Sequence, residues 1–346
     1  GTLLSGGAVP IRHMTSDPAR LELNRPSPRA VFQRSTANKG SIPVAGVSRT
    51  LRASVFARWV RADGSGAGKW QRLADDPGRG EFAGYLTAPA GGWYTIEVEA
   101  KLGNSVAATA EIAKVGVGEV FVTAGQSNSA NYGQRWLTAA RDRVSAWGPG
   151  GWRPAADPQP IAKFSLGSPW PYLGDLLVEK LGVPVAFVST GWGGSSVESW
   201  ANEESVQYAR LRYVLRELGV RGCRAVLWHQ GEANSKTGTE AADYAGELRT
   251  LITHSRRDSG WEIPWVIAQV SFLGPTRPDK GAGVRQAQRQ VAGDEAVFAG
   301  PNTDSLDIEW RISERNIHFN EAGLHKHAAL WMHALTEAFF TDTQPR

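Results

Sequence analysis

The pattern of hydrophobic and polar positions along the chain changes its period near residue 117. Before that residue, short runs such as 51–59 and 93–100 alternate apolar with mostly polar side chains, and turn signals such as the Asp-Gly-Ser-Gly segment at 63–66 separate them. Alternation with a period of two gives a strand one buried side and one solvent-facing side. We therefore expect residues 1–116 to form an antiparallel β-sandwich domain.

After residue 117, short and wholly apolar strands alternate with helices. The strands are expected near 120–122, 184–188, 225–228, 265–270 and 296–298, and the helices near 173–181, 208–218, 244–251 and 324–339. Repeated β–α units with apolar strands predict a parallel sheet that helices cover on both faces. Residues 117–346 should therefore form an α/β domain whose functional site lies at the carboxyl ends of the strands.

Ser127 follows the first of these strands, directly after Gly125 and Gln126 and at the expected start of a helix. A hydroxyl at this place stands at the edge of the sheet, and the backbone N–H of the same residue points to the same spot. The position suits a nucleophile, although an ordinary helix-capping serine has the same signature. The segment is not the Gly-x-Ser-x-Gly motif of the α/β-hydrolases.

Three other segments near strand ends carry residues that suit acyl transfer. The Gly-Trp-Gly-Gly segment at 191–194 lets backbone N–H groups approach a ligand, and the absence of a following Lys excludes a P-loop. Gln230 and Asn234 offer amide donors for an oxyanion. His318, just before the last helix, lies where it can reach the sheet edge. Each segment alone is also typical of an ordinary polar loop.

Composition and charge exclude several classes of function. The chain lacks the run of about 18 apolar residues that a membrane-spanning helix needs. Its net charge of +4 comes from scattered residues, which argues against a nucleic-acid partner. The single Cys223 excludes an intramolecular disulfide and a Cys-rich zinc site. His325, His327 and His333 lack the i, i+4 spacing of a helical metal site, so we expect no metal and no other cofactor.

Two residue types are abundant. The 39 Gly residues indicate many tight turns, and the 14 Trp residues suit either stacking on sugar rings or packing inside β-domains. The first residues lack the basic start and long apolar stretch of a signal peptide. We expect a secreted or periplasmic protein whose signal peptide is absent from this sequence, and we make no prediction of its oligomeric state.

Taken together, the segments resemble the SGNH/GDSL hydrolase superfamily, and within it the sialate O-acetylesterase-like carbohydrate esterases. The similarity covers about residues 117–340. It is carried by Gly-Gln-Ser-Asn at 125–128, Gly-Trp-Gly-Gly-Ser at 191–195, His-Gln-Gly-Glu-Ala-Asn at 229–234, and Ile-His-Phe at 317–319 with Gly323. The β-domain resembles the accessory domain of such proteins. The resemblance implies a three-layer, flavodoxin-like fold and removal of O-acetyl groups from sialic acid or from a plant or bacterial polysaccharide.

The resemblance also implies a role for each matching residue. His318 would remove the proton from Ser127, which would attack the ester carbonyl and form an acetyl-enzyme. The oxyanion would be held by the N–H of Ser127, by Gly193 or Gly194, and by the Gln230 side chain, with Asn234 as second choice. Candidates for contact with the substrate are Gln126, Asn128, Arg135, Trp170, Trp192 and Trp200.

The acid of the catalytic triad departs from the family pattern. The family usually carries an Asp three residues before the catalytic His, and here that position is Arg315. Glu314 is the nearest carboxylate, Glu232 is the alternative acid, and a Ser–His dyad steadied by a backbone carbonyl is the third option. The missing Asp also leaves open a carbohydrate-binding homologue with impaired catalysis, and a general short-chain esterase fits the same residues.

Overall fold

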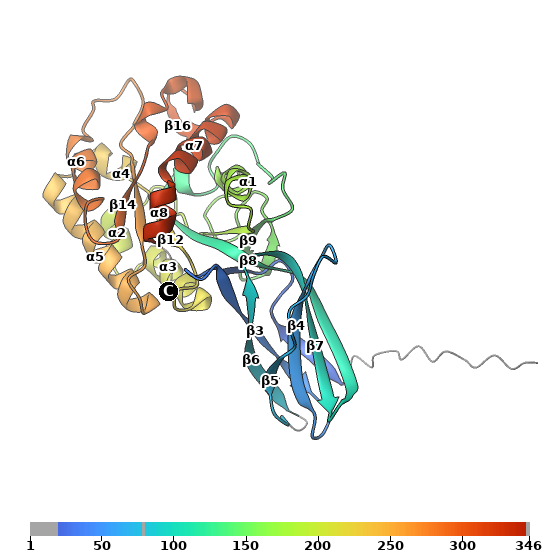
Figure 1. Cartoon of the computed structure of the whole chain (residues 1–346). Helices are drawn as coiled ribbons and strands as arrows, with labels where there is room; N and C mark the ends of the chain where they lie inside the picture. The colour runs from blue at the N-terminus through green and yellow to red at the C-terminus, as the bar shows by residue number, and fades with distance from the viewer. Residues whose placement is uncertain (1–19, 78–79, 344–346) are drawn as a thin grey trace, which may run out of the picture.

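The computed structural model describes residues 20–77 and 80–343, which form a β-rich region and a larger α/β region (Figure 1). Residues 1–19 of the expected N-terminal domain and residues 344–346 lie outside the described residues. In Figure 1 the β-rich region projects from one end of the α/β region, and strand β8 (Ser105–Gly125) runs from one into the other.

The β-rich region is a sandwich of two sheets. One sheet pairs β1 (Leu21–Arg25), β3 (Lys39–Ser48) and β6 (Glu81–Pro89), all antiparallel. The other pairs β5 (Gln71–Ala74), β4 (Ser54–Arg61), β7 (Gly91–Leu102) and the first part of β8, again antiparallel, while the short β2 (Val31–Gln33) lies parallel to β8. Apolar side chains of both sheets form one core, among them Ile42 from β3 and Ile96 from β7. These contacts confirm the antiparallel β-structure that the period-two pattern predicts.

Strand β8 joins the two regions without a linker. It pairs with β7 in the sandwich and, from Glu119 onward, with the parallel strands of the α/β sheet. The expected boundary between residues 116 and 117 therefore falls inside one continuous strand, and the division into two domains stays a prediction. The Glu119 side chain is completely buried and forms ion pairs with Arg224 at 2.6 Å and with Arg34 at 2.5 Å. Arg34 belongs to the β-rich region and Arg224 to the α/β region, so the Glu119 carboxylate connects the two. Removing one partner of a buried pair would leave an uncompensated charge.

The central sheet of the α/β region has seven strands, among the described residues, in a single path. Their order is β10 (Gly151–Pro154), β9 (Val144–Gly148), β11 (Val185–Ser189), β8, β12 (Ala225–His229), β13 (Trp265–Gln269) and β14 (Val297–Asn302). All neighbours pair in parallel except β10, which is antiparallel to β9 at the edge. This confirms the parallel sheet that the apolar strands predict; the β9–β10 hairpin was not expected.

Helices cover both faces of this sheet, which gives the predicted three layers (Figure 1). One face packs against α2 (Val197–Ala201), α3 (Val206–Leu218), α5 (Ala241–Ser259) and α6 (Ala282–Val291). The other packs against α1 (Trp170–Leu181), α7 (Glu321–Ala334) and α8 (Glu337–Asp342). The short α4 (Glu232–Thr237) follows β12 directly.

The prediction of one helix near 324–339 is wrong, because this part of the chain forms two helices. Helix α7 ends at Ala334, and Thr336 begins α8 by accepting a hydrogen bond on its side chain from the Phe339 N–H. A threonine in this role is a common helix start. The apolar spacing across 324–339 continues through the break, so periodicity alone does not reveal it.

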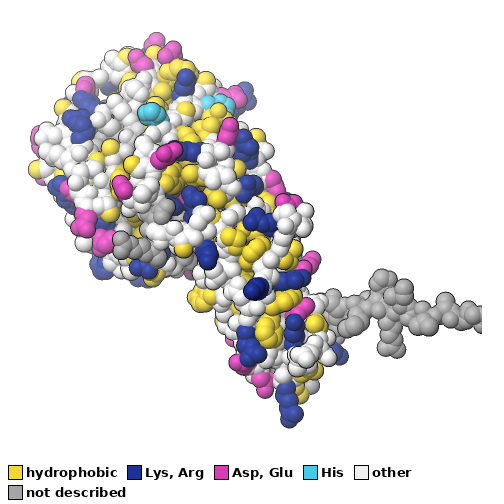
Figure 2. All heavy atoms as spheres, viewed as in Figure 1, with side chains coloured by type: hydrophobic (Ala, Val, Ile, Leu, Met, Phe, Trp, Pro, Cys, Tyr) yellow, Lys and Arg dark blue, Asp and Glu magenta, His cyan; other side chains and the backbone are white. Residues whose placement is uncertain are grey.

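Charged side chains of both signs are spread over the face shown in Figure 2, and they do not gather there into one continuous basic patch. Within residues 20–77 and 80–343, no helix is both long and apolar enough to cross a membrane.

Candidate active site

Ser127 lies at the carboxyl end of the central strand β8, as expected. Gly125 ends the strand with a φ of +130°, and a Cβ there would lie 2.1 Å from the carbonyl oxygen of His229, so the residue must be glycine. Ser127 then begins the 3-10 helix η1 (Ser127–Ser129) and is 4% exposed. Ser127 therefore starts a helix as expected, but this helix is a single turn of three residues.

His318 lies on a short hairpin, although its sequence is also typical of an ordinary polar loop. Strand β15 (Arg311–Ser313) pairs with β16 (Asn316–Phe319), and helix α7 follows directly. The side chain of Asn320 accepts a hydrogen bond from the Gly323 N–H and so begins α7. The hairpin and this helix start hold His318 half-buried at the end of the chain's last strand.

Asn128 connects the Ser127 segment to the His318 segment across 189 positions of sequence. Its Nδ2 donates to the carbonyl oxygen of Ile317 at 3.3 Å and to Oε1 of Glu232 at 2.9 Å. The neighbours of Ser127 and His318 are therefore joined directly. Neither the Ser127 hydroxyl nor the His318 imidazole hydrogen-bonds to another described residue, which leaves both open to a substrate; catalytic hydrogen bonds often tighten only when substrate is present.

The environment of His318 favours the neutral imidazole. Burial lowers its pKa to about 4, and the nearby cation of Arg311 acts in the same direction. Its ring lies 5.1 Å from the ring of Tyr132. A neutral imidazole can accept a proton, which is the property that a general base requires.

Arg311 is a buried cation that the sequence analysis missed. It is 5% exposed and donates to the backbone oxygens of Leu306, Thr303 and Ile317 at 3.0, 3.1 and 2.7 Å. Its guanidinium lies 4.0 Å from the centre of the Phe319 ring. Arg311 thereby fixes the strand that carries His318. Arg311 stands between Trp310 and Ile312, and an Arg is mostly exposed in folded proteins, so the sequence around it does not mark it as buried.

Neither candidate acid contacts His318. Glu314 lies in the exposed turn between β15 and β16 and forms no hydrogen bond or ion pair with another described residue. Glu232 is buried, and Asn128 is the hydrogen-bond partner of its carboxyl; its second oxygen, Oε2, has no partner among the described residues. Burial raises the pKa of Glu232 to about 7, although the Asn128 hydrogen bond and the charge of Arg311 oppose the shift. Neither a carboxylate nor the backbone carbonyl that the dyad would use hydrogen-bonds to the His318 imidazole among the described residues, so the choice among the three options stays a prediction.

The buried carboxyl of Glu232 should make stability depend on pH. Folding raises its pKa from 4.5 to about 7, so its contribution is fully present below pH 4.5 and is lost as the pH rises through 7. Glu232→Gln keeps an acceptor for Asn128 and removes the charge. We expect the free energy of unfolding of the variant, relative to the wild type, to improve by ~2–3 kcal/mol between pH 5 and pH 8. Urea denaturation at both pH values measures this change.

The exposed Glu314→Gln is the matched control for that experiment, because it makes the same change at a carboxyl that is not buried. A Glu232→Gln difference that does not change with pH would show that Glu232 is ionised without cost in the folded chain.

The loop after β11 presents backbone N–H groups beside the site. Gly193 packs against Tyr132 so closely that a Cβ would lie 2.2 Å from the Tyr132 hydroxyl oxygen. The N–H groups of Gly193 and Gly194 donate to no acceptor among the described residues, whereas the neighbouring Trp192 and Ser195 N–H groups are paired. Since Tyr132 also contacts His318, the free N–H groups of this loop lie close to the His318 segment.

The two expected amide donors are used inside the protein. Nε2 of Gln230 donates to Gln126 Oε1 at 3.2 Å and to Asn234 Oδ1 at 2.8 Å, and it also lies 3.2 Å from the Ser195 backbone oxygen. Asn234 in turn donates to the carboxylate of Glu198 at 2.9 Å. Both amides are completely or almost completely buried. Because their N–H groups already bind these acceptors, they hold the loops together and offer no free donor to an oxyanion.

The residues expected to contact substrate divide into buried and exposed ones. Gln126 and Asn128 are 3% and 5% exposed, and their side chains bind other parts of the site. The expectation that Trp170 and Trp200 stack on a sugar is wrong, because both are completely buried in the cores on either side of the sheet. Their burial could not be read from their positions near the predicted loops.

Trp192 and Arg135 are more accessible. The half-buried Trp192 packs against the core and lies under two cations, with Lys163 Nζ 4.3 Å and Arg210 Cζ 4.7 Å from its ring centre. These neighbours leave little of its ring for a sugar. The Arg135 side chain is 71% exposed and lies 3.9 Å from the carboxylate of Glu321.

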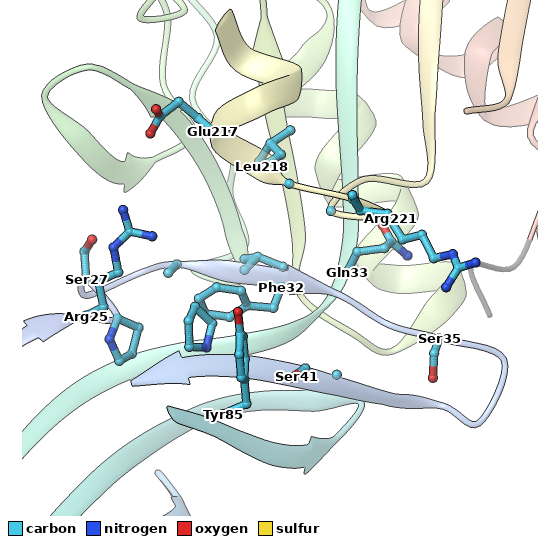
Figure 3. A pocket seen from close by; sticks show the side chains of 18 of the residues that line it. Arg25, Ser27, Phe32, Gln33, Ser35, Ser41, Tyr85, Glu217, Leu218 and Arg221 are labelled. Carbon is cyan, nitrogen blue, oxygen red and sulfur yellow. The ribbon is translucent and has the colours of Figure 1, made fainter. Parts of the chain in front are cut away.

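A wide cleft of about 1070 Å³ lies elsewhere, at the junction of the two regions. Figure 3 shows Tyr85 of the β-rich region rising toward Phe32, with Glu217 and Leu218 at the end of α3 on the opposite wall. None of the expected site residues lines this cleft. In the part of the chain that the structure describes, no group of three or more His, Cys, Asp or Glu residues could hold a metal ion.

Comparisons with known proteins give a family match and structures of similar fold. A family model described as carbohydrate esterase, sialic acid-specific acetylesterase matches residues 117–337. A carbohydrate acetylesterase from Xanthomonas citri has a similar structure, with 20% identity, a TM-score of 0.58, and coverage of 91% of this chain and 74% of that chain. A protein from Arabidopsis thaliana shares 16% identity over 65% of this chain and 98% of that chain, with a TM-score of 0.49. No curated protein sequence matches.

Proposed function

Since the chain belongs to the carbohydrate esterase family of sialic acid-specific acetylesterases, and is thus a carboxylic ester hydrolase, we propose that it removes O-acetyl groups from carbohydrate by a serine mechanism. Ser127 is the nucleophile of this proposal and His318 its general base. The observation that carries it is the Asn128 side chain, which binds the backbone of the His318 strand from the residue next to Ser127.

In the proposed first step, Nε2 or Nδ1 of His318 takes the proton of the Ser127 hydroxyl while Oγ attacks the acetyl carbonyl carbon. The negative oxygen of the tetrahedral intermediate is held by the backbone N–H groups of Ser127, Gly193 and Gly194. Collapse breaks the bond to the sugar oxygen, which takes the proton from His318. Water then attacks the acetyl-enzyme with His318 as base and releases acetate.

Two features of the site support this version of the mechanism. The Gly193 and Gly194 N–H groups have no acceptor among the described residues, whereas the amides of Gln230 and Asn234 are already engaged. The His318 imidazole has no carboxylate partner among them either, so we propose a Ser–His dyad. Removal of one oxyanion donor typically lowers turnover on the order of 10²–10³-fold.

The proposed function is tested by measuring acetate release from a panel of acetylated carbohydrates, including O-acetylated sialic acid, xylan and pectin. We expect acetate release from at least one of them, and slower release of butanoate or octanoate from matched esters. Binding of an acetylated glycan without release of acetate would instead identify an impaired homologue. Faster turnover of the longer acyl chains would identify a general esterase.

The pH dependence of this activity should follow the environment of His318. Only the neutral imidazole can act as base, and burial, aided by Arg311, lowers its pKa to about 4. We expect kcat/KM to be lost as the pH falls through about 4 and to be level above ~pH 5, because the free enzyme's base controls this profile. Rates from pH 3.5 to 8, with folding checked by circular dichroism, measure it. A midpoint near the ordinary histidine value would contradict the buried setting of His318.

A further inference from the structure

An exposed group of aromatic side chains lies beside His318. Trp136 is 63% exposed and Phe164 is 57% exposed, which is unusual for rings of this size. Phe164 stacks on Tyr132 with ring centres 4.7 Å apart and planes 16° apart, and Tyr132 contacts the His318 ring. The Tyr132 ring therefore lies between Phe164 and His318, the proposed general base.

The segments that carry these rings are held firmly to each other. Trp136 Nε1 donates to the backbone oxygen of Ser165 at 2.7 Å, so the indole is tied to the segment of Phe164. The backbones at Gly133 and Gly167 exchange hydrogen bonds of 2.8 and 3.0 Å in both directions. The two rings therefore belong to one braced surface, although 28 positions separate them in sequence.

The same surface is tied to the catalytic segments. Asn131, four residues after Ser127, donates through Nδ2 to the backbone oxygen of Phe164 at 3.2 Å. The Lys163 N–H donates to the Gly191 oxygen at 2.9 Å, in the loop that carries the proposed oxyanion donors. Phe164 has a φ of +69°, a left-handed conformation that is costly for an aromatic residue. Such strain is found where a side chain is held in place for a function.

We propose that Phe164 and Trp136 form a platform on which the sugar ring of the acetylated carbohydrate stacks while its acetyl group reaches Ser127. This inference rests on the proposed function and names the surface that selects a sugar. Apolar C–H groups of a pyranose face pack on an aromatic face, whose electron density is negative. The hydroxyl groups of the sugar stay in water, because both rings are exposed.

The platform is distinct from the tryptophans that sequence position suggested. Trp170 and Trp200 are completely buried, and Trp192 lies under Lys163 and Arg210. Trp136 and Phe164 have free faces and a braced backbone. Arg135, next to Trp136, places an exposed cation at the rim, which suits a sugar that carries a carboxylate.

The experiment compares two substrates with the same acetyl group. Glucose pentaacetate carries a pyranose ring, and ethyl acetate carries none. We expect Phe164→Ala and Trp136→Ala each to lower the ratio of kcat/KM for glucose pentaacetate to that for ethyl acetate about five- to tenfold, mainly through KM. Trp136→Phe, which keeps an aromatic face, should restore most of the ratio. Tyr85→Ala, a 72% exposed aromatic of the distant cleft, is the control and should keep the wild-type ratio.

An unchanged ratio in both alanine variants, or an equal loss on both substrates, would overturn the platform, because a merely structural role would affect the two esters alike. No hydrogen bond or ring stacking joins Trp136 to Tyr132, so its variant separates sugar binding from disturbance of His318. Release of acetate from neither substrate by the wild type would overturn the platform, and release from none of the acetylated carbohydrates of the panel above would contradict the proposed function as well. Release from ethyl acetate alone would overturn the platform and leave the serine mechanism standing.

Discussion

Ser127→Ala should abolish ester hydrolysis while leaving the fold intact. The hydroxyl makes no hydrogen bond to a described residue, so its removal costs the folded chain little, whereas the proposed reaction loses its nucleophile. We expect kcat to fall on the order of 10⁴–10⁶-fold, as in other serine hydrolases that lose this group. Acetate release from glucose pentaacetate measures the loss, and urea denaturation checks stability.

Ser129→Ala is the matched control for this variant. Ser129 lies in the same 3-10 helix and is also buried, but its hydroxyl already donates to the backbone oxygen of Gln126 at 2.7 Å. It should lose ~1 kcal/mol of stability and keep most of its activity. Full activity in Ser127→Ala would remove Ser127 from the mechanism, while equal losses in both variants would indicate damage to the helix.

His318→Ala should have the second largest effect. Without a base at the site, attack by the Ser127 hydroxyl is slow, and we expect kcat to fall on the order of 10³–10⁵-fold. The acid limb of the pH profile, near pH 4 in the wild type, should disappear with the side chain. Added imidazole should restore part of the activity, because truncation to alanine leaves space beside Tyr132 for the free ring.

Glu314→Gln is the matched control in the same hairpin. Glu314 lies in the exposed turn before β16, so we expect its turnover within about twofold of the wild type. If Glu314 were the triad acid, its loss could cost about 10⁴-fold. A sharp fall in the turnover of Glu314→Gln would therefore contradict the dyad. If His318→Ala kept wild-type turnover and did not respond to added imidazole, His318 would have no part in the mechanism.

Local sequence patterns predicted the fold class and pointed to the proposed nucleophile and base. Period-two alternation predicted the strands around 51–59 and 93–100, and wholly apolar runs predicted the parallel strands, because one-sided or two-sided burial leaves a direct mark on neighbouring residues. Ser127 follows β8 as expected, and His318 comes just before the last long helix. The matching segments also indicated the esterase family that residues 117–337 show.

Only the tertiary structure decided which side chains are free to act. Trp200, which the sequence suggested as a contact for the sugar, is completely buried, whereas Trp136, which the sequence did not single out, is 63% exposed. The Gln230 amide donates its hydrogen bonds to other residues of the protein, among them the distant Gln126. The buried Arg311 donates to the backbone of the strand that carries His318.

The physical reason is that burial and hydrogen-bond partnership depend on contacts between distant segments. The contact of Asn128 with the Ile317 backbone spans 189 positions, so no local period or motif carries it. The sequence by itself therefore determined that a Ser and a His stand at the edge of a parallel sheet. The packing of loops that lie far apart in the sequence decided which acids, amides and aromatic rings surround them.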